Sequence, residues 1–175
     1  MTNNVSSHLE DCDEDLQKEI KEDLRWVKTR TGVDVSKAEV DSVDSMGEAA
    51  GTCVIETGAI KFREDTLAAN NAKFFKERRY KTGSFRHVAR HESEHAKGNR
   101  LEGTTELVAS KEVGVEPVPA YRSKVCAAKV MVDILGYDKT MELARQKGAE
   151  VLLFVALFQA KISASAAADL VKKAA

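Results

Sequence analysis

The sequence predicts an α+β fold, a small sheet early in the chain followed by helices, in one domain over residues 10–175. Two observations predict it. β-prone residues flank a Thr-Gly pair within residues 49–64, and from residue 84 onward helical patterns alternate with glycines and prolines. The length of 175 residues also suits a single hydrophobic core.

Composition and charge describe an ordinary globular chain, with 43% hydrophobic residues, 31% charged residues and a net charge of -1. This balance gives no overall attraction to nucleic acid or to an anionic membrane, so neither is expected as the main partner. The first residues lack the basic and apolar regions of a signal peptide. The longest apolar run, 151–158, is far shorter than the roughly 18 residues of a membrane span. We therefore expect a cytoplasmic protein without a membrane partner.

The N-terminal part is predicted to contain a flexible arm and one amphipathic helix. Residues 1–9 are polar and unpatterned, which favours a flexible arm. From Asp13, apolar residues recur at steps of three or four and form one stripe of a helix that closes near Gly32. The stripe consists of Leu16, Ile20, Leu24 and Val27.

Residues 49–64 predict two short strands or a hairpin, and a basic segment with interleaved aromatic residues follows at 73–86. Gly83 and Ser84 then supply a turn and a helix N-cap. Because no glycine or proline follows until Gly98, this stretch is predicted to be a helix.

Four further helical stretches are predicted near 100–113, 120–135, 139–147 and 150–174. The prolines of the Val-Glu-Pro-Val-Pro segment at 115–119 impose an extended connection after the first of them. Two glycines, Gly136 and Gly148, separate the others.

The most informative motif is His-Glu-Ser-Glu-His at residues 91–95, an HExxH sequence on the helix predicted after Ser84. Residues i and i+4 of a helix project from one face, so His91 and His95 can bind one ion. A catalytic zinc ion takes three protein ligands and leaves a position for water, whose proton Glu92 can accept as general base. The alternative is a charged helix face exposed to solvent.

A metal site of this kind needs a third ligand. Glu102 and Glu106 follow the motif, again four residues apart and therefore on one face of the next predicted helix. Either glutamate can supply the third ligand. Alternatively, Glu102 forms a capping box with Asn99, which leaves Glu106 as the ligand.

The HESEH motif followed by EGTTE at 102–106 resembles the gluzincin group of zinc metallopeptidases, and EGTTE resembles the EGxxE of bacterial collagenases and minimal gluzincins. The resemblance implies a zincin-like fold that binds Zn2+, with Glu102 as the third ligand. It also implies that Glu106 hydrogen-bonds a zinc-bound histidine from behind. One strand within 49–64 would then be an edge strand that holds an extended peptide or protein substrate.

The connection between the two motifs departs from the gluzincin pattern, because only six residues separate His95 from Glu102. HESEHAKG also resembles the metzincins, which turn sharply at a glycine in the position of Gly98. Leu101 stands where the third metzincin ligand would be, which favours Glu102.

Tyr121 and His87 are further candidates. Tyr121 follows the extended connection, and its phenol resembles the group that stabilises the oxyanion in many zincins, so it is assigned a catalytic role. The alternative is an amphipathic tyrosine at a helix start. His87 lies one turn before His91 and can shield the metal, bind substrate or merely pack.

The sequence therefore predicts a zinc-dependent endopeptidase with Glu92 as the general base. The alternative is a non-catalytic zincin-like or helical binding module that contacts nucleic acid through the basic segment 73–86. A solvated basic face explains that segment equally well.

Overall fold

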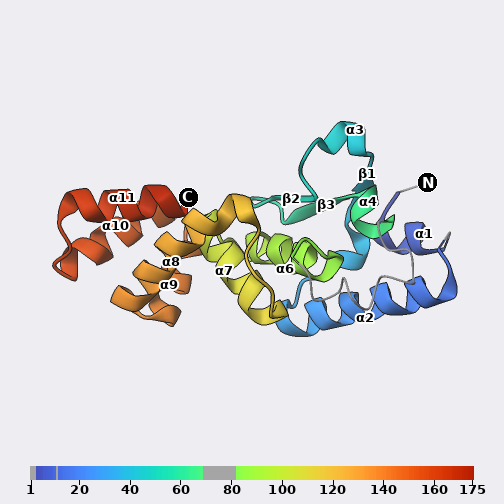
Figure 1. Ribbon diagram of the computed structural model, residues 1–175, viewed down its shortest axis with the longest axis horizontal. Coiled ribbons are helices and arrows are strands. Elements are labelled where there is room, and N and C mark those ends of the chain that lie inside the picture. The colour runs from blue at the N-terminus through green and yellow to red at the C-terminus, as the bar shows by residue number, and fades with distance from the viewer. Residues whose placement is uncertain (1–2, 11, 69–81) are drawn as a thin grey trace.

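The computed structural model describes residues 3–10, 12–68 and 82–175, and its fold is α+β. Figure 1 shows helix α6 (Phe85–Ala96) in the middle of the molecule, with the sheet on one side and α2 (Glu14–Thr31) on the other. Helix α7 (Glu102–Val113) packs beside α6, and the helices from α8 onward lie toward one end. The sheet, α2 and α7 thus surround α6.

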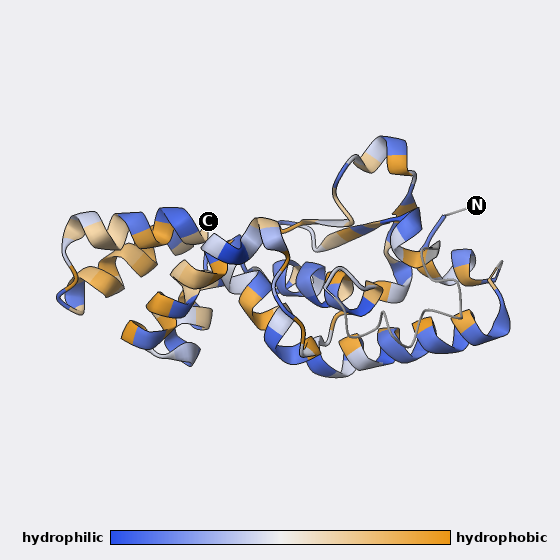
Figure 2. Cartoon of the chain, viewed as in Figure 1, coloured by the Kyte–Doolittle hydropathy of each residue, from blue (hydrophilic) through white to orange (hydrophobic). Residues whose placement is uncertain are grey.

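Helix α2 forms where its apolar stripe predicts it. The side chain of Asp13 accepts a hydrogen bond from the backbone of Leu16, and Gly32 closes the helix in a left-handed conformation. Figure 2 shows apolar residues alternating with long hydrophilic stretches along this helix. The buried stripe packs against α6.

Residues 3–9, predicted to be a flexible arm, form a short helix and contacts with the sheet in the structure. Helix α1 (Val5–Leu9) is capped by Asn4, and the side chains of Val5 and Leu9 are buried. Asn3 exchanges hydrogen bonds with Val40 in strand β1 (Glu39–Asp41). The sequence pattern did not predict helix α1, because the segment is held by backbone hydrogen bonds and by only two apolar side chains.

The sheet has three strands in the order β1-β3-β2. Strands β2 (Gly51–Val54) and β3 (Ala59–Arg63) form the predicted hairpin and pair antiparallel. Strand β1 pairs parallel with β3, and with three residues it is too short to show an alternating pattern. The short helices α3 (Val43–Met46) and α4 (Glu64–Ala68) precede and follow the hairpin.

The C-terminal part contains α8 (Arg122–Leu135), α9 (Tyr137–Ala144), α10 (Ala149–Gln159) and α11 (Ala164–Ala174). The single helix predicted over 150–174 is therefore two helices. Lys161 adopts a φ of 66° and the backbone N–H of Ile162 donates to the carbonyl of Leu157, which ends α10 in a Schellman-type turn. No glycine or proline marks this turn, so the sequence pattern predicted one continuous helix.

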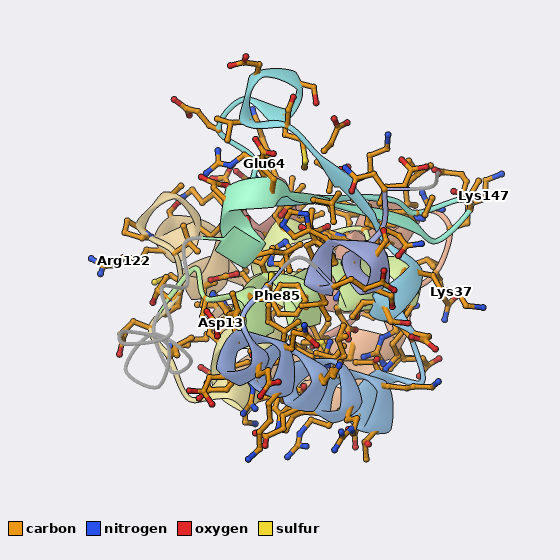
Figure 3. All side chains as sticks on the ribbon, turned by 90° about the vertical axis from the view of Figure 1, so that its right-hand side faces the viewer. Asp13, Lys37, Glu64, Phe85, Arg122 and Lys147 are labelled. Atoms are coloured by element: carbon orange, nitrogen blue, oxygen red, sulfur yellow. The ribbon has the colours of Figure 1, made fainter. Side chains whose placement is uncertain are left out.

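Two apolar cores meet at the junction of α6 and α7. One joins α1, α2, the sheet and a face of α6, and the other joins α7 to the helices that follow it. In the end-on view of Figure 3, Phe85 lies in the interior of the first core, whereas Lys37 and Arg122 lie at the periphery. Within the described ranges, no helix is long and apolar enough to cross a membrane.

Candidate metal centre

Helix α6 carries the HExxH motif in an almost fully buried setting. Ser84 caps the helix by accepting a hydrogen bond from the backbone of His87, as predicted. Every residue from 85 to 95 is buried, because α2, the sheet and α7 cover the helix on different sides. The alternative of a solvent-exposed charged face is therefore wrong.

A tight turn after α6 delivers the third side chain. Gly98 has a φ of 94°, and a Cβ atom placed there would lie 2.9 Å from the carbonyl oxygen of Arg145, so only glycine fits without strain. Leu101 is buried in the C-terminal core and serves as the N-cap of α7. The next residue, Glu102, begins α7 and faces the two histidines of the motif.

The metal cluster, defined as His91, His95 and Glu102, brings two imidazole nitrogens close to each other and each of them close to one oxygen of the same carboxylate. The two histidine Nε2 atoms are 3.2 Å apart, and each lies 3.3 Å from an oxygen of Glu102. Ligands that bind a tetrahedral zinc ion at about 2.0–2.1 Å are about 3.3 Å from one another. The cluster can therefore hold a metal ion.

Hydrogen bonds behind the rings determine which nitrogen faces the centre. The Nδ1 atom of His95 lies 2.8 Å from the carbonyl oxygen of Asn99, which only accepts, so Nδ1 carries the proton and Nε2 presents its lone pair. His91 makes the equivalent bond with Glu106, at 2.9 Å. Glu102 Oε2 is buried and has no hydrogen-bond partner among the described residues. The two Nε2 atoms and the Glu102 carboxylate thus converge, and a metal ion would satisfy all three groups.

The carboxylates around His91 change the pKa of its ring. Burial alone lowers the pKa of this ring, but the carboxylates of Glu102 and Glu106 outweigh burial and raise it to about 9. Without an ion the ring therefore holds a second proton at Nε2, facing Glu102, and a bound cation would take the place of that proton. Burial opposes the charged form of Glu102 as well, yet the two histidines hold its pKa well below the usual range.

Glu106 lies behind His91 and takes no position in the metal cluster. Its Oε1 atom accepts a hydrogen bond from the backbone of Val118 at 2.7 Å and one from Ser110 at 3.2 Å, and it contacts His87 Nε2 at 3.3 Å. Burial would raise its pKa, but the bonds from His87, His91 and Val118 hold it at about 2. Glu106 is therefore a charged acceptor that orients His91.

The capping-box alternative for Glu102 does not describe the structure. Leu101 is the N-cap and contributes no side-chain bond, and the Oδ1 atom of Asn99 accepts hydrogen bonds from the backbone of Leu101 and the hydroxyl of Thr104. Glu102 is left free to face the histidines.

Glu92 lies beside the metal cluster and is buried. Burial raises the pKa of its carboxyl group, and Glu102 adds to this effect while His91 and His95 oppose it. Strand β2 crosses the helix here so closely that a Cβ atom on Gly51 would lie 2.9 Å from Glu92 Cγ. The close approach of Gly51 limits where the Glu92 side chain can lie.

Tyr121 packs against the ring of His91. It ends the short 3-10 turn Pro119–Tyr121, and its ring stacks on the His91 ring with 5.5 Å between centroids. Burial, together with the carboxylates of Glu102, Glu92 and Glu106, raises the pKa of its phenol to about 12. Tyr121 therefore remains a hydrogen-bond donor beside the metal cluster at neutral pH.

A cavity of about 400 Å³ opens next to the cluster, between the start of β2, helix α6 and the segment before α8. Its size is within the roughly 300–1,000 Å³ of small-molecule and peptide side-chain sites. It is lined by Glu48, Ala49, Ala50, Gly51, Gly83, His87, Val88, His91, Glu92, Glu106, Val118, Ala120 and Tyr121.

The two edges of the sheet differ. Residues 3–5 bond along the outer edge of β1, through Val5 to Ala38 and Val40 to Asn3. Among the described residues, no strand pairs with the outer edge of β2. This unpaired edge is the one that begins at the cavity.

The sequence did not define the role of His87 and gave little sign of its partners. His87 is buried, its Nδ1 accepts a hydrogen bond from the backbone of Gly83, and its Nε2 faces Glu106. The spacing of four residues to His91 was the only signal. It could not reveal that Glu106 joins the two rings.

The basic segment 73–86 lies largely outside the described residues, and its described end does not support nucleic-acid binding. Arg86 is buried and forms an ion pair with Asp23, and Phe85 packs edge-on against Phe62. Neither side chain is exposed to a nucleic acid.

Comparisons of this chain with protein-family models, with curated proteins and with solved structures find no match. The resemblance to zinc metallopeptidases therefore depends on the residues of the site alone.

Proposed function

We propose that this protein is a zinc-dependent endopeptidase with a zincin-like site. The observation that carries the proposal is the convergence of two imidazole lone pairs and a carboxylate at 3.2–3.3 Å, with the buried carboxyl group of Glu92 beside them. Among the described residues, no ion pair of the Glu92 side chain is found, so no structural pairing explains a buried carboxyl group at this position.

Zinc suits this ligand set better than the other common ions. Two histidine nitrogens and one carboxylate oxygen are typical of catalytic zinc, whereas calcium and magnesium prefer sites made of oxygen atoms. When bound, zinc supplies Lewis-acid chemistry, lowering the pKa of a water molecule and polarising a carbonyl group.

The residues around the cluster then have separate roles in proton transfer, charge stabilisation and ligand orientation. Glu92, whose pKa is raised by burial, accepts a proton from the attacking water and passes it to the leaving amine. Tyr121 donates a hydrogen bond to the carbonyl oxygen as negative charge develops on it. Glu106 and the Asn99 carbonyl hold His91 and His95 in the orientation required.

Strand β2 supplies a place for an extended substrate. Arg63 N–H donates to the Ala50 carbonyl, so in this antiparallel ladder the backbone groups of Gly51 and Cys53 point away from β3 toward the exposed edge. A peptide added there gains backbone hydrogen bonds next to Glu92. This supports cleavage within a chain over hydrolysis of a small ester or amide.

The test compares the wild-type protein with Glu92→Gln, both loaded with zinc, on a mixture of quenched fluorescent peptides. Glu92→Gln keeps the side-chain shape and removes the base, so hydrolysis should fall by about a hundredfold to ten-thousandfold. Zinc content should be unchanged, because Glu92 is not a ligand. If both proteins bind zinc and neither cleaves any peptide, the non-catalytic binding module becomes the better account.

A further inference from the structure

The relative direction of β2 and α6 determines which part of a bound peptide faces the cavity. A Cβ atom on Gly51 would contact Val88 and Glu92, whereas one on Gly58, after β2, would lie near the carbonyl of Ala96. Strand β2 therefore runs along α6 toward the C-terminal end of the helix. A peptide paired antiparallel to β2 runs the other way, so its carboxyl-terminal side reaches residues 48–50 and the cavity.

Most polar groups that line this cavity already have partners. Both ring nitrogens of His87 are engaged, by Gly83 and by Glu106. The backbone N–H of Val118 donates to Glu106, whose own oxygens are shared between four groups. Apart from Glu48 and the site residues His91, Glu92 and Tyr121, the remaining walls are alanine, valine and glycine, which favour an aliphatic occupant.

Glu48 differs from the buried carboxylates of the cavity in lying at its exposed rim. It lines the cavity and is exposed, and within the described part of the chain no ion pair of its carboxylate is found. The other lining carboxylates are Glu92 and Glu106, and no lysine or arginine is among the lining residues. An apolar cavity with a free carboxylate at its rim complements a side chain with an aliphatic stem and a cationic end.

The segment that carries Glu48 is fixed to the sheet rather than loose. Arg63, paired with Asp65, donates a hydrogen bond from its guanidinium to the Gly47 carbonyl. The Ala50 carbonyl accepts hydrogen bonds from the backbone of Arg63 and the hydroxyl of Thr66. Glu48 is thus anchored on both sides at the rim.

We infer that Glu48 selects peptides with lysine or arginine on the carboxyl-terminal side of the cleaved bond. This inference rests on the peptidase function proposed above. It also implies that aspartate and glutamate are disfavoured at that position, because their charge would face Glu48.

The experiment uses peptides that differ at one position only, carrying lysine, leucine or aspartate directly after the cleaved bond. Hydrolysis is measured with the zinc-loaded protein, and binding is measured by fluorescence anisotropy with the zinc-loaded Glu92→Gln variant. The lysine peptide should be favoured over the leucine peptide by about tenfold in both, an effect of about 1.4 kcal/mol. High salt should weaken the preference, since Glu48 is exposed.

Glu48→Gln should abolish this preference, and Glu48→Lys should favour the aspartate peptide. Asp44→Asn is the matched control, because it removes the same charge from the neighbouring helix α3 outside the cavity lining, and it should keep the preference. Equal treatment of lysine and leucine by the wild-type protein, or a preference that survives Glu48→Gln, would overturn the inference. A lysine preference in binding without any hydrolysis would support selection by Glu48 and contradict the peptidase function.

Discussion

Buried residues of helix α6 belong to two clusters of charged and polar groups that differ in how they are satisfied. On one face, the ion-pair network joins Arg90, Glu94, Glu112 and Arg145 through contacts of 2.7–3.0 Å, for example between Arg90 Nε and Glu112 and between Arg145 Nε and Glu94. On another face, the metal cluster joins two imidazoles to one carboxylate, and no lysine or arginine among the described residues pairs with it. The network contains permanent cations, whereas in the metal cluster either a proton on a histidine or a bound metal ion must balance Glu102.

This difference shows what identifies a functional group inside a protein. Glu92 and Glu94 are two residues apart in one motif, and both are buried. Burial opposes the charged form of Glu94, but Arg90 and Arg145 hold its pKa below the usual range. The pKa of Glu92 is raised instead. Burial alone therefore does not distinguish Glu94 from Glu92, the proposed general base, but the presence or absence of paired arginines does.

Breaking the ion-pair network should have the largest effect on folding. Glu94→Ala leaves Arg90 and Arg145 without their shared acceptor and should lower the free energy of unfolding by about 3–5 kcal/mol. Urea denaturation of the metal-free protein measures this. Glu94→Gln, which keeps the volume and one acceptor, should lose less. Both variants should bind zinc as the wild-type protein does once folded. Loss of zinc binding by folded Glu94→Gln would contradict the independence of the ion-pair network and the metal cluster.

The two glutamates of α7 sharpen the comparison within the metal cluster. Glu106→Ala removes the acceptor behind His91 and should weaken zinc binding by about ten- to hundredfold. Glu102→Ala removes a ligand and should weaken it further. Competition with a chromophoric chelator measures both affinities. A greater loss for Glu106→Ala than for Glu102→Ala would show that the two roles are reversed.

An exposed ion pair should have the smallest effect. Lys28 and Asp34 lie 2.7 Å apart near the end of α2, and both side chains are exposed to solvent. Lys28→Ala should change the free energy of unfolding by less than about 1 kcal/mol. The hydrogen bond from Lys28 is the main cause that lowers the pKa of Asp34 to about 2, so the variant should raise that pKa toward 3.8. NMR titration of the Asp34 carboxyl group checks this, and an unchanged pKa would contradict the assigned cause.

The sequence predicted the parts of the molecule that depend on local patterns. The Ser84 cap, the HExxH helix, the hairpin and the turn at Gly98 each follow from a few adjacent residues. The spacing of Glu102 and Glu106 also placed them on one face of α7.

Features that depend on distant partners were missed. Arg145 meets Glu94 across 51 residues, and no periodicity in the sequence connects them. The pairing of residues 3–5 with β1 uses backbone atoms, which carry no sequence signal.

One local feature was also missed. The break between α10 and α11 occurs at Lys161 in a left-handed conformation without a glycine, so the usual sign of a helix end was absent.

The metal content of the purified protein tests the central claim most directly. After dialysis against zinc and removal of loosely bound ions, elemental analysis should find about one zinc ion per wild-type chain, as expected for three ligands in one cluster. The variant with both His91→Ala and His95→Ala should contain none, while its circular dichroism spectrum should remain that of the wild-type protein. Stoichiometric zinc in that variant, or none in the wild-type protein, would contradict the assignment of the metal cluster.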